Sequence, residues 1–319
     1  MKKFRFIFIV LLIWVFSIAA SAAEFLIPGG QVIGLQLTDD TVTIAAFEET
    51  FSPAQKAGLK EGDQILQING KKITCVDDVR QVLSKSDAQV KISVLRNGKT
   101  KNIIVAPAVS ADGPKLGVYL KQGITGVGTV TYYDTDGEEF AALGHGVNTQ
   151  SGNLLRLKTG SIYKAGVLSV KKGTVGTPGQ LFGSLVEEQS VGVIEKNTNQ
   201  GVFGKLATEV KGEPLPVAEK EDVHTGQATI RSTVDGTTLQ EYSVEILKIY
   251  PNSKERTRNM LIKVTDPKLL QATGGIVQGM SGSPIIQNGK LIGAVTHVLV
   301  NDPTTGYGIF IENMLDAAA

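Results

Sequence analysis

The chain has 319 residues, which at roughly 150 residues per domain favours two domains, and 42% hydrophobic residues are enough for a buried core in each. Lys and Arg total 32 against 31 Asp and Glu, so the near-neutral charge disfavours binding to nucleic acid. The single cysteine, Cys75, excludes an intramolecular disulfide and any multi-cysteine metal site. Glycine accounts for 36 residues, well above the average of about 7%, which predicts short strands joined by tight turns.

The N-terminal segment, residues 1–23, has the pattern of a secretory signal peptide. Three cations among the first five residues precede the apolar run Phe6–Phe16, and Ala20-Ser21-Ala22 forms a small-residue cleavage signal. If this segment is not cleaved, it is just long enough, at about 20 residues per span, to remain as a membrane anchor. In both cases the cations stay inside, so the rest of the chain is expected outside the cytoplasm.

Residues 24–108 are predicted to form a first domain of short strands and two short helices. An N-cap serine and a first-turn proline predict one helix over Ser52–Ala57, and hydrophobic residues at helical spacing predict another over Asp77–Ser84. Two Asn-Gly pairs predict hairpins, because both central residues of a type I′ turn need a positive φ. The predicted strands are Val32–Leu37, Thr41–Ala46, Gln64–Ile68 and Val90–Leu95, and the pairs are Asn69-Gly70 and Asn97-Gly98.

The segment Ala57–Lys71, which reads AGLKEGDQILQINGK, resembles the most recognisable part of bacterial PDZ domains. These domains bind an extended peptide as an added strand, and backbone N–H groups of a loop hold its terminal carboxylate. The resemblance implies that Ile33, Gly34 and Leu35 form this peptide-binding loop, where a glycine lets an anion approach the backbone. The alternative is that Gly34 is only a turn residue and that the groove binds nothing in trans.

Residues 109–123 are predicted to be a linker, and residues 124–319 a second domain. Ala106–Pro114 is small, polar and rich in proline, which is typical of linkers. Alternating strand patterns follow, with 12 glycines from Gly144 to Gly204 and no long periodic helix before the last segment. This region is therefore expected to be an all-β barrel or sandwich.

A glycine-rich turn around Ser281 carries the strongest chemical signal. Flanking glycines let the backbone turn tightly and expose the serine Oγ, and they leave the N–H groups of Gly279 and Ser281 free to converge as an oxyanion hole. A strand, an Asn-Gly hairpin and another strand are predicted to follow. Together these features resemble the serine loop of chymotrypsin-like proteases. Such a turn alone is more often structural than catalytic. Whether Ser281 is a candidate nucleophile therefore depends on whether the chain also supplies a general base.

Three histidines are candidates for that base. His145 lies between two glycines at the end of an apolar run and precedes Ser281 in the chain, which gives the histidine-first, serine-last order of chymotrypsin. It is the preferred base, with a structural loop histidine as the alternative. His297 is predicted to lie half-buried in a strand, where a structural role is the more common one. His224 is the rival base.

The third member of a triad is a carboxylate, and the residues alone do not choose among Asp222, Asp235, Asp266 and several glutamates. Longer segments, however, strongly resemble the stage IV sporulation protein B peptidases of endospore-forming bacteria. The segments are LGHG around His145, VTDP around Asp266, GMSGSP around Ser281 and THVLVNDPTTGYGI from Thr296. The resemblance implies that Asp266, which shortly precedes Ser281 in the chain, is the acid. An Asp-Pro turn former is the alternative for Asp266.

The expected fold is mainly β, with a PDZ domain (α+β) followed by a chymotrypsin-like but divergent β-barrel serine peptidase domain. The expected activity is that of a serine endopeptidase with a Ser-His-Asp triad. His145 would take the proton from Ser281, Gly279 and Ser281 would hold the oxyanion, and Asp266 would orient His145. No cofactor or metal ion is expected.

The family resemblance further implies a role in signalling between compartments during sporulation. Exported into the space between the forespore and mother-cell membranes, the peptidase would cleave an extracytosolic part of a membrane processing complex and so trigger activation of a late sigma factor. The PDZ ligand would be a peptide in cis or in trans. Two alternatives stay open: a catalytically silent PDZ adaptor, and a quality-control protease that degrades unfolded proteins.

Overall fold

The computed structural model describes residues 25–86, 89–111, 113–149 and 152–319. The predicted signal segment, residues 1–23, lies outside the described residues. Strands dominate, which confirms the mainly β fold class. No helix within the described ranges is both long and apolar enough to cross a membrane.

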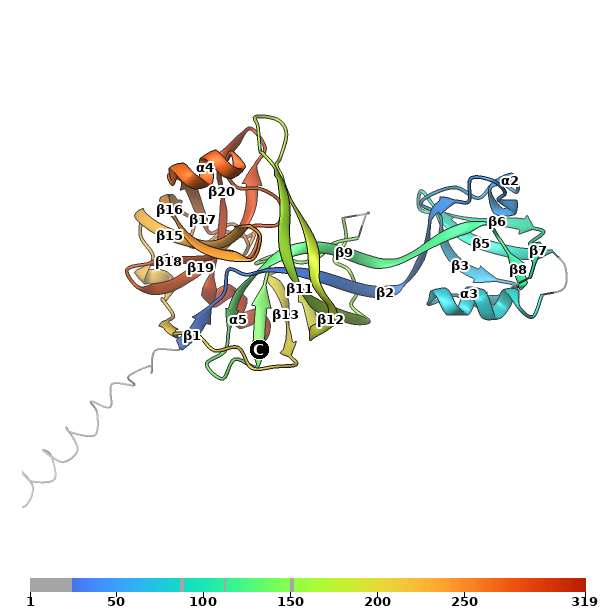
Figure 1. Cartoon of the computed structure of the whole chain (residues 1–319), viewed down its shortest axis with the longest axis horizontal. Helices are drawn as coiled ribbons and strands as arrows, with labels where there is room; N and C mark the ends of the chain where they lie inside the picture. The colour runs from blue at the N-terminus through green and yellow to red at the C-terminus, as the bar shows by residue number, and fades with distance from the viewer. Residues whose placement is uncertain (1–24, 87–88, 112, 150–151) are drawn as a thin grey trace, which may run out of the picture.

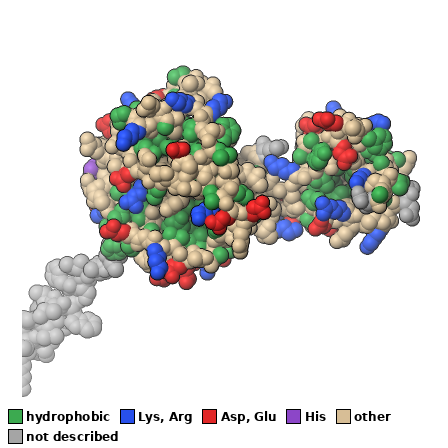
Figure 2. All heavy atoms as spheres, viewed as in Figure 1, with side chains coloured by type: hydrophobic (Ala, Val, Ile, Leu, Met, Phe, Trp, Pro, Cys, Tyr) green, Lys and Arg blue, Asp and Glu red, His purple; other side chains and the backbone are tan. Residues whose placement is uncertain are grey.

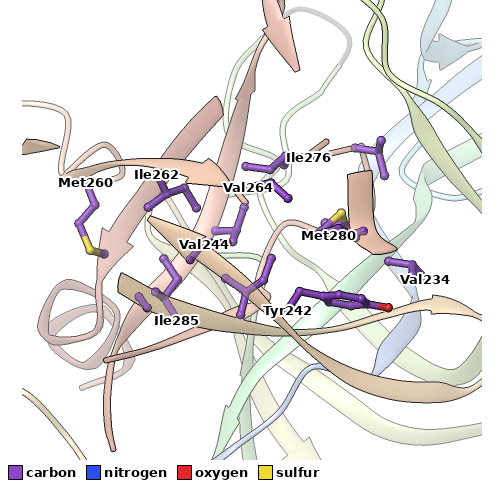
Figure 3. Packing of buried hydrophobic residues seen from close by; sticks show 14 of the residues in the cluster. Val234, Tyr242, Val244, Met260, Ile262, Val264, Ile276, Met280 and Ile285 are labelled. Carbon is purple, nitrogen blue, oxygen red and sulfur yellow. The ribbon is translucent and has the colours of Figure 1, made fainter. Parts of the chain in front are cut away.

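The C-terminal third forms a closed six-stranded antiparallel barrel, here called the second barrel. Its strands alternate between buried and exposed residues; in β16, for example, Tyr242, Val244 and Ile246 point inward between exposed neighbours. Figure 3 shows Tyr242 and Val244 packed with other side chains in the barrel interior. The strands are β15 (Gly226–Asp235), β16 (Thr238–Ile249), β17 (Met260–Val264), β18 (Pro284–Gln287), β19 (Lys290–Leu299) and β20 (Asp302–Phe310).

Six earlier strands close into another barrel, the first barrel, because β2 and β9 pair with each other as well as with their other neighbours. Around the ring the order is β2, β9, β10, β13, β12 and β11. Their bounds are β2 (Val32–Phe47), β9 (Val118–Tyr133), β10 (Glu139–Ala142), β11 (Thr159–Lys171), β12 (Gln180–Thr198) and β13 (Gly201–Leu206).

The two barrels have the same topology. Numbered along the chain, the strands of each barrel follow the ring order first, second, third, sixth, fifth and fourth, and the fourth closes on the first. The barrels lie side by side on the left of Figure 1. Helix α4 (Pro267–Thr273) follows the third strand of the second barrel, and helix α5 (Ile311–Ala318) ends the chain. Short strands β1 (Phe25–Pro28) and β14 (Leu215–Pro216) pair with each other at the edge of the sheet that contains the first barrel.

An inserted domain lies between the first and second strands of the first barrel. Strands β2 and β9 leave the barrel as one paired ribbon, and Figures 1 and 2 show the domain as a separate lobe at its end. Its core runs from Val42 to Leu116 and shares no residue with the core clusters of the two barrels. Its elements are α2 (Pro53–Lys56), β3 (Gln64–Ile68), β4 (Lys71–Lys72), α3 (Val76–Leu83), β5 (Val90–Arg96), β6 (Lys99–Val105), β7 (Ala108–Ser110) and β8 (Gly113–Lys115).

This insertion changes the predicted order of domains. The expected PDZ range, 24–108, begins with residues that belong to the first barrel, and the expected linker, 109–123, contains a paired hairpin and the start of β9. The buried positions of β2 change phase between Leu37 and Val42, where its register with β9 also shifts, so from the sequence this single strand looks like two strands of one domain. The peptidase part therefore begins before the inserted domain and resumes after it.

Several local predictions for the inserted domain are confirmed. Ser52 caps α2 by accepting a hydrogen bond from the Gln55 N–H, with Pro53 in the first turn. In both Asn-Gly pairs, each residue has a positive φ, as a type I′ hairpin requires. The second helix, α3, begins and ends one residue earlier than predicted.

Candidate active site

Ser281 lies on the connection between the third and fourth strands of the second barrel, just before β18. Gly279 and Gly282 have φ values of 101° and 98°, in the left-handed region that favours glycine. Between them Met280 is fully buried, and Figure 3 shows it among the other side chains of the barrel core. The methionine anchors the loop, and the serine next to it remains partly accessible.

Two backbone N–H groups in this loop are available to a ligand. Met280, Gly282 and Ser283 donate to backbone carbonyls of the same barrel. In contrast, the N–H groups of Gly279 and Ser281 have no hydrogen-bond partner among the described residues. These are the two donors predicted for the oxyanion hole, and a free pair at this point of the turn fits that chemistry.

His145 lies at the equivalent connection of the first barrel, between its third strand β10 and its fourth strand β11. Leu143 and Gly144 both have left-handed φ values, 73° and 67°, and this double bend turns the chain out of the barrel. Since a non-glycine residue seldom adopts such a φ, the strain at Leu143 is typical of a functional loop. The bend brings His145 to the cleft that contains Ser281.

The tautomer of His145 is set by a backbone carbonyl. The Nδ1 atom lies 3.0 Å from the Gly146 carbonyl oxygen, which can only accept, so Nδ1 carries the proton and donates it. Nε2 is left with its lone pair, as a general base requires. Burial, partly opposed by the Gly146 hydrogen bond, lowers the pKa of His145 below its usual 6.5. The imidazole is therefore neutral at physiological pH.

Ser281 and His145 line one cleft of about 550 Å³ between the barrels. Ser281 Oγ donates a 2.8 Å hydrogen bond to the Thr296 carbonyl, so attack on a substrate requires Oγ to rotate toward the imidazole. No Asp, Glu, Lys or Arg lines the cleft. Its wall is mostly apolar and includes Ile124, Val127, Pro178, Ile276, Val298 and Val300.

His297 also lines this cleft, which the sequence analysis did not anticipate. Its ring centroid lies 5.3 Å from that of His145, and its Nδ1 atom is buried without a partner among the described residues. Burial, the neighbouring His145 and Arg258 lower the pKa of His297 to about 4. His297 is thus a neutral neighbour of the base. It follows Ser281 on the second strand of the next hairpin, and this closeness in the chain could have signalled the contact.

The structure does not bring Asp266 into the cleft. Its carboxylate caps α4, because Oδ1 accepts hydrogen bonds from the Lys268 and Leu269 N–H groups at 2.9 and 3.0 Å. The other oxygen faces the Ser243 N–H, and Pro267 occupies the first turn. This placement matches the alternative role of an Asp-Pro turn former. The assignment of Asp266 to the triad stays a prediction of the family resemblance.

An asparagine holds the segment that follows His145. Asn197, near the end of β12, accepts a hydrogen bond from the Val147 N–H and donates to the carbonyls of Val147 and Leu155. All three bonds are 2.9 Å long. The side chain therefore holds the segment after His145 in place without a charge. The sequence analysis missed this residue, because nothing in its neighbourhood differs from an ordinary strand end.

The other candidates lie elsewhere. His224 is exposed on the outside of the second barrel, where its Nε2 is 2.9 Å from the Asn288 amide nitrogen. Asp222 forms an ion pair with Lys290 at 2.7 Å. Neither residue lines the cleft. The position of His224 removes the main rival to His145.

The family model of the SpoIVB peptidase S55 matches residues 113–315. The chain belongs to this family. The match covers the second strand of the first barrel and all later strands, including Ser281 and His145. The expected peptidase family is thereby confirmed. A PDZ-domain model matches residues 48–96, so the inserted domain is a PDZ domain.

Similar proteins of known sequence cover only parts of the SpoIVB-family chain. A putative zinc metalloprotease of Rhizobium meliloti, R01501, is 26% identical over 217 residues, which are 65% of this chain and 52% of that protein. The serine protease Do-like HtrB of Bacillus subtilis is 46% identical over 55 residues, 16% of this chain and 12% of that protein. The chain thus spans about half or less of the length of these relatives. Within the described residues, no group of three or more His, Cys, Asp or Glu side chains could hold a metal ion.

Among solved structures, the inactive form of the Rv3671c protease is similar, with 15% identity and a TM-score of 0.36 over 60% of this chain and 81% of that one. A serine-to-alanine mutant of Rv3671c from M. tuberculosis H37Rv gives a TM-score of 0.34, with 15% identity over 60% of this chain and 78% of that one.

The predicted peptide-binding loop of the PDZ domain is wrong. Ile33, Gly34 and Leu35 lie inside β2, paired with β9 on one side and β11 on the other. Both isoleucine and leucine are buried in the first barrel, so these backbone groups are already used by the sheet. The residues belong to the barrel that carries His145, not to the PDZ lobe.

A groove in the PDZ domain lies instead between α3 and the start of β9. Leu116 and Gly117 begin it, and Gly117 has a left-handed φ of 68°. From Val118 to Leu120, β9 pairs with β2 along one edge only, and no other described strand pairs with its second edge there. An extended peptide can add to that edge between the strand and the helix, which is how PDZ domains bind.

Proposed function

We propose that the protein is an exported endopeptidase of sporulation, which cleaves an extracytosolic part of a membrane processing complex and thereby triggers activation of a late mother-cell sigma factor. The shared cleft of Ser281 and His145, in a chain of the SpoIVB peptidase S55 family, carries this proposal. The signal pattern of residues 1–23 supports export to the space between the forespore and mother-cell membranes.

The proposed reaction uses groups that surround the cleft. His145 Nε2 takes the proton of Ser281 Oγ as the oxygen attacks the scissile carbonyl. The Gly279 and Ser281 N–H groups bind the oxyanion, and the proton then passes from the imidazolium to the leaving amine. Water hydrolyses the acyl-enzyme by the same route. These reaction steps require only residues whose positions the structure describes.

The PDZ domain would supply recognition outside the cleft. Its groove accepts an extended segment or chain terminus of a protein partner, while the cleft accepts the scissile segment. Two sites joined by the β2–β9 ribbon can hold one substrate at once, which raises the effective concentration of the scissile segment. We therefore expect efficient cleavage of one tethered target and weak cleavage of short peptides.

The decisive experiment uses the full chain in a sporulating host that lacks its own copy. We expect Ser281→Ala to abolish both cleavage of the membrane-complex protein and late sigma-factor activity, with the exposed His224→Ala as the matched control. Signalling by Ser281→Ala without cleavage would instead identify an adaptor. Digestion of denatured chains as fast as the membrane-complex target would identify a quality-control protease.

A separate variant tests the recognition site. Val118→Asp places a carboxylate in the groove beside the free strand edge, so cleavage of the membrane target should fall while hydrolysis of a short peptide is kept. Equal loss of both would show that the groove does not act in recognition.

A further inference from the structure

Thr129 lies where the two barrels meet and has all of its polar groups bound to the catalytic loops. It belongs to β9 of the first barrel, its side chain is fully buried, and it does not line the cleft. Its Oγ1 donates to the Gly279 carbonyl at 2.8 Å, and its N–H donates to the Ser281 carbonyl at 3.0 Å. Its own carbonyl accepts from the Leu143 N–H at 3.2 Å, in the loop that leads to His145.

The two carbonyls that Thr129 holds belong to the two residues with free N–H groups. The Gly279 carbonyl and the Gly279 N–H lie in the two peptide planes that flank this residue, and its φ and ψ set the angle between those planes. A hydrogen bond that fixes the carbonyl plane therefore limits how the plane with the N–H can turn. Gly279 has no side chain, so its backbone has more freedom than any non-glycine residue in the loop. The Thr129 hydroxyl holds the Gly279 carbonyl and so restricts the conformations that this glycine can adopt. The threonine thus sits behind the proposed oxyanion hole and fixes it from the first barrel.

Close packing reinforces this connection. A Cβ atom added to Gly282 would lie 2.0 Å from the Thr129 carbonyl oxygen and 2.5 Å from the Leu143 nitrogen. The serine loop therefore rests directly on the backbone of Thr129 and of the histidine loop. A displacement of the Thr129 backbone would therefore move both the serine loop and the histidine loop, because both pack directly against it.

We propose that Thr129 is a positioning residue for the oxyanion hole. Its hydroxyl holds the Gly279 carbonyl so that the N–H groups of Gly279 and Ser281 face one point, and its backbone sets the distance between the serine and histidine loops. The inference rests on Ser281 and His145 as the catalytic pair. The threonine acts through these loops and touches no substrate.

Loss of the hydroxyl should slow chemistry with little effect on substrate binding. In Thr129→Val the shape is kept, but the Gly279 carbonyl loses its donor and the glycine can turn its N–H away. Since removal of an oxyanion donor costs about 10²–10³ in kcat, we expect misplacement of one to lower kcat by about 10- to 100-fold. KM should stay within about threefold, because this interaction matters mainly in the transition state.

The chain offers a matched control two residues away. Thr131 is also fully buried in β9, but its hydroxyl has no hydrogen-bond partner among the described residues. Thr131→Val makes the same chemical change without breaking a bond to the serine loop. Thr129→Ser keeps the hydroxyl and should restore most of kcat. If Thr129→Val does not fold, Thr129→Ser against Thr129→Cys makes the same comparison, because a thiol is a weak donor.

The measurements are kcat and KM on a short fluorogenic peptide, thermal unfolding, and affinity for a peptide aldehyde, which forms a tetrahedral adduct on the serine. We expect aldehyde affinity to fall in Thr129→Val in proportion to kcat/KM, with Thr129→Ser and Thr131→Val near the wild type. Equal kcat in Thr129→Val and Thr131→Val would overturn the proposal, as would a loss of kcat that only follows thermal instability. Covalent labelling of the wild type at a serine other than Ser281 would overturn the catalytic pair and this inference together.

Discussion

The first and second barrels have the same strand order but are interrupted in different places. The second barrel is interrupted mainly by α4 before the serine loop, whereas the first barrel holds a whole PDZ domain between its first two strands. In spite of this, the connection from third to fourth strand supplies the key residue in both: His145 in one and Ser281 in the other. Equivalent positions in two like barrels therefore face each other across one cleft.

The local chemistry of these two connections explains their different roles. In the second barrel, glycines at 279 and 282 and the buried Met280 leave two N–H groups free beside a hydroxyl. In the first barrel, the bend at Leu143 and Gly144 brings to the cleft an imidazole whose Nδ1 donates to a carbonyl. The shared topology thus places the serine and the histidine at the cleft. The sequence of each turn decides which residue acts as nucleophile and which as base.

The largest expected effect tests whether the two barrels contribute equally. His145→Ala should lower kcat as much as Ser281→Ala does, by about 10⁴- to 10⁶-fold, because members of a catalytic unit act together. His224→Ala, on the outer surface, should leave kcat unchanged. Full activity in His145→Ala together with loss of activity in His297→Ala would identify His297 of the second barrel as the base. It would contradict the view that each barrel supplies one catalytic residue.

The second prediction concerns the contact between the barrels. Gly282→Ala should cost about 4 kcal/mol or more, because its Cβ would overlap the Thr129 carbonyl and its φ of 98° strains an alanine. Gly289→Ala is the control: its φ is also positive, but a Cβ there meets nothing within 4 Å, so the cost should be about 1 kcal/mol. Urea unfolding measures both. Equal costs would mean that the barrels do not rest on each other at this point.

The sequence predicted best those features that depend on local chemistry. The cap at Ser52, the Asn-Gly hairpins and the glycine turn around Ser281 each follow from the conformations that a few neighbouring residues allow. The choice of His145 over His224 also agreed with the cleft, because a residue bent out of an apolar run can reach it, although His297 lines the cleft as well.

The features that failed depend on pairing between distant segments. Gly34 was assigned to a peptide loop of the PDZ domain, because the change of phase in β2 between Leu37 and Val42 looks like a turn between two strands of one domain, whereas one strand passes from the barrel into the PDZ domain. Thr129 and Asn197 gain their roles from partners in distant parts of the chain, and a single sequence gives little sign of such contacts. Asp266 has a strong local role as a helix cap, and its sequence pattern cannot separate that role from a catalytic one.

A third prediction uses the uncharged wall of the cleft. A peptide with Leu or Val on the acyl side of the scissile bond should be cleaved about 100-fold faster, by kcat/KM, than the same peptide with Lys or Asp, because a charge has no partner there. Val298→Asp should recover much of the activity toward Lys. Equal rates for charged and apolar side chains would place the specificity site outside this cleft.

The helix cap gives a smaller effect that separates the two roles of Asp266. Asp266→Ala should lower stability by about 1 kcal/mol through loss of the cap on α4, whereas Asp266→Asn should be nearly neutral, because asparagine caps as well as aspartate. Thermal unfolding measures this pattern. A large loss of kcat in Asp266→Asn at an unchanged melting temperature would place the carboxylate in the triad instead.

The smallest expected effect is the pH dependence of catalysis. His145 must be neutral to accept the serine proton, and burial holds its pKa below 6.5, so kcat/KM should rise with pH through a midpoint below 6.5. His297→Gln should leave that midpoint nearly unchanged, because His297, with a pKa of about 4, is neutral where His145 titrates. A midpoint above 6.5 would contradict this prediction, since only a nearby negative charge would favour the imidazolium against burial. Such a result would require a carboxylate beside His145 during catalysis, and the first barrel would then need a movement that brings one there.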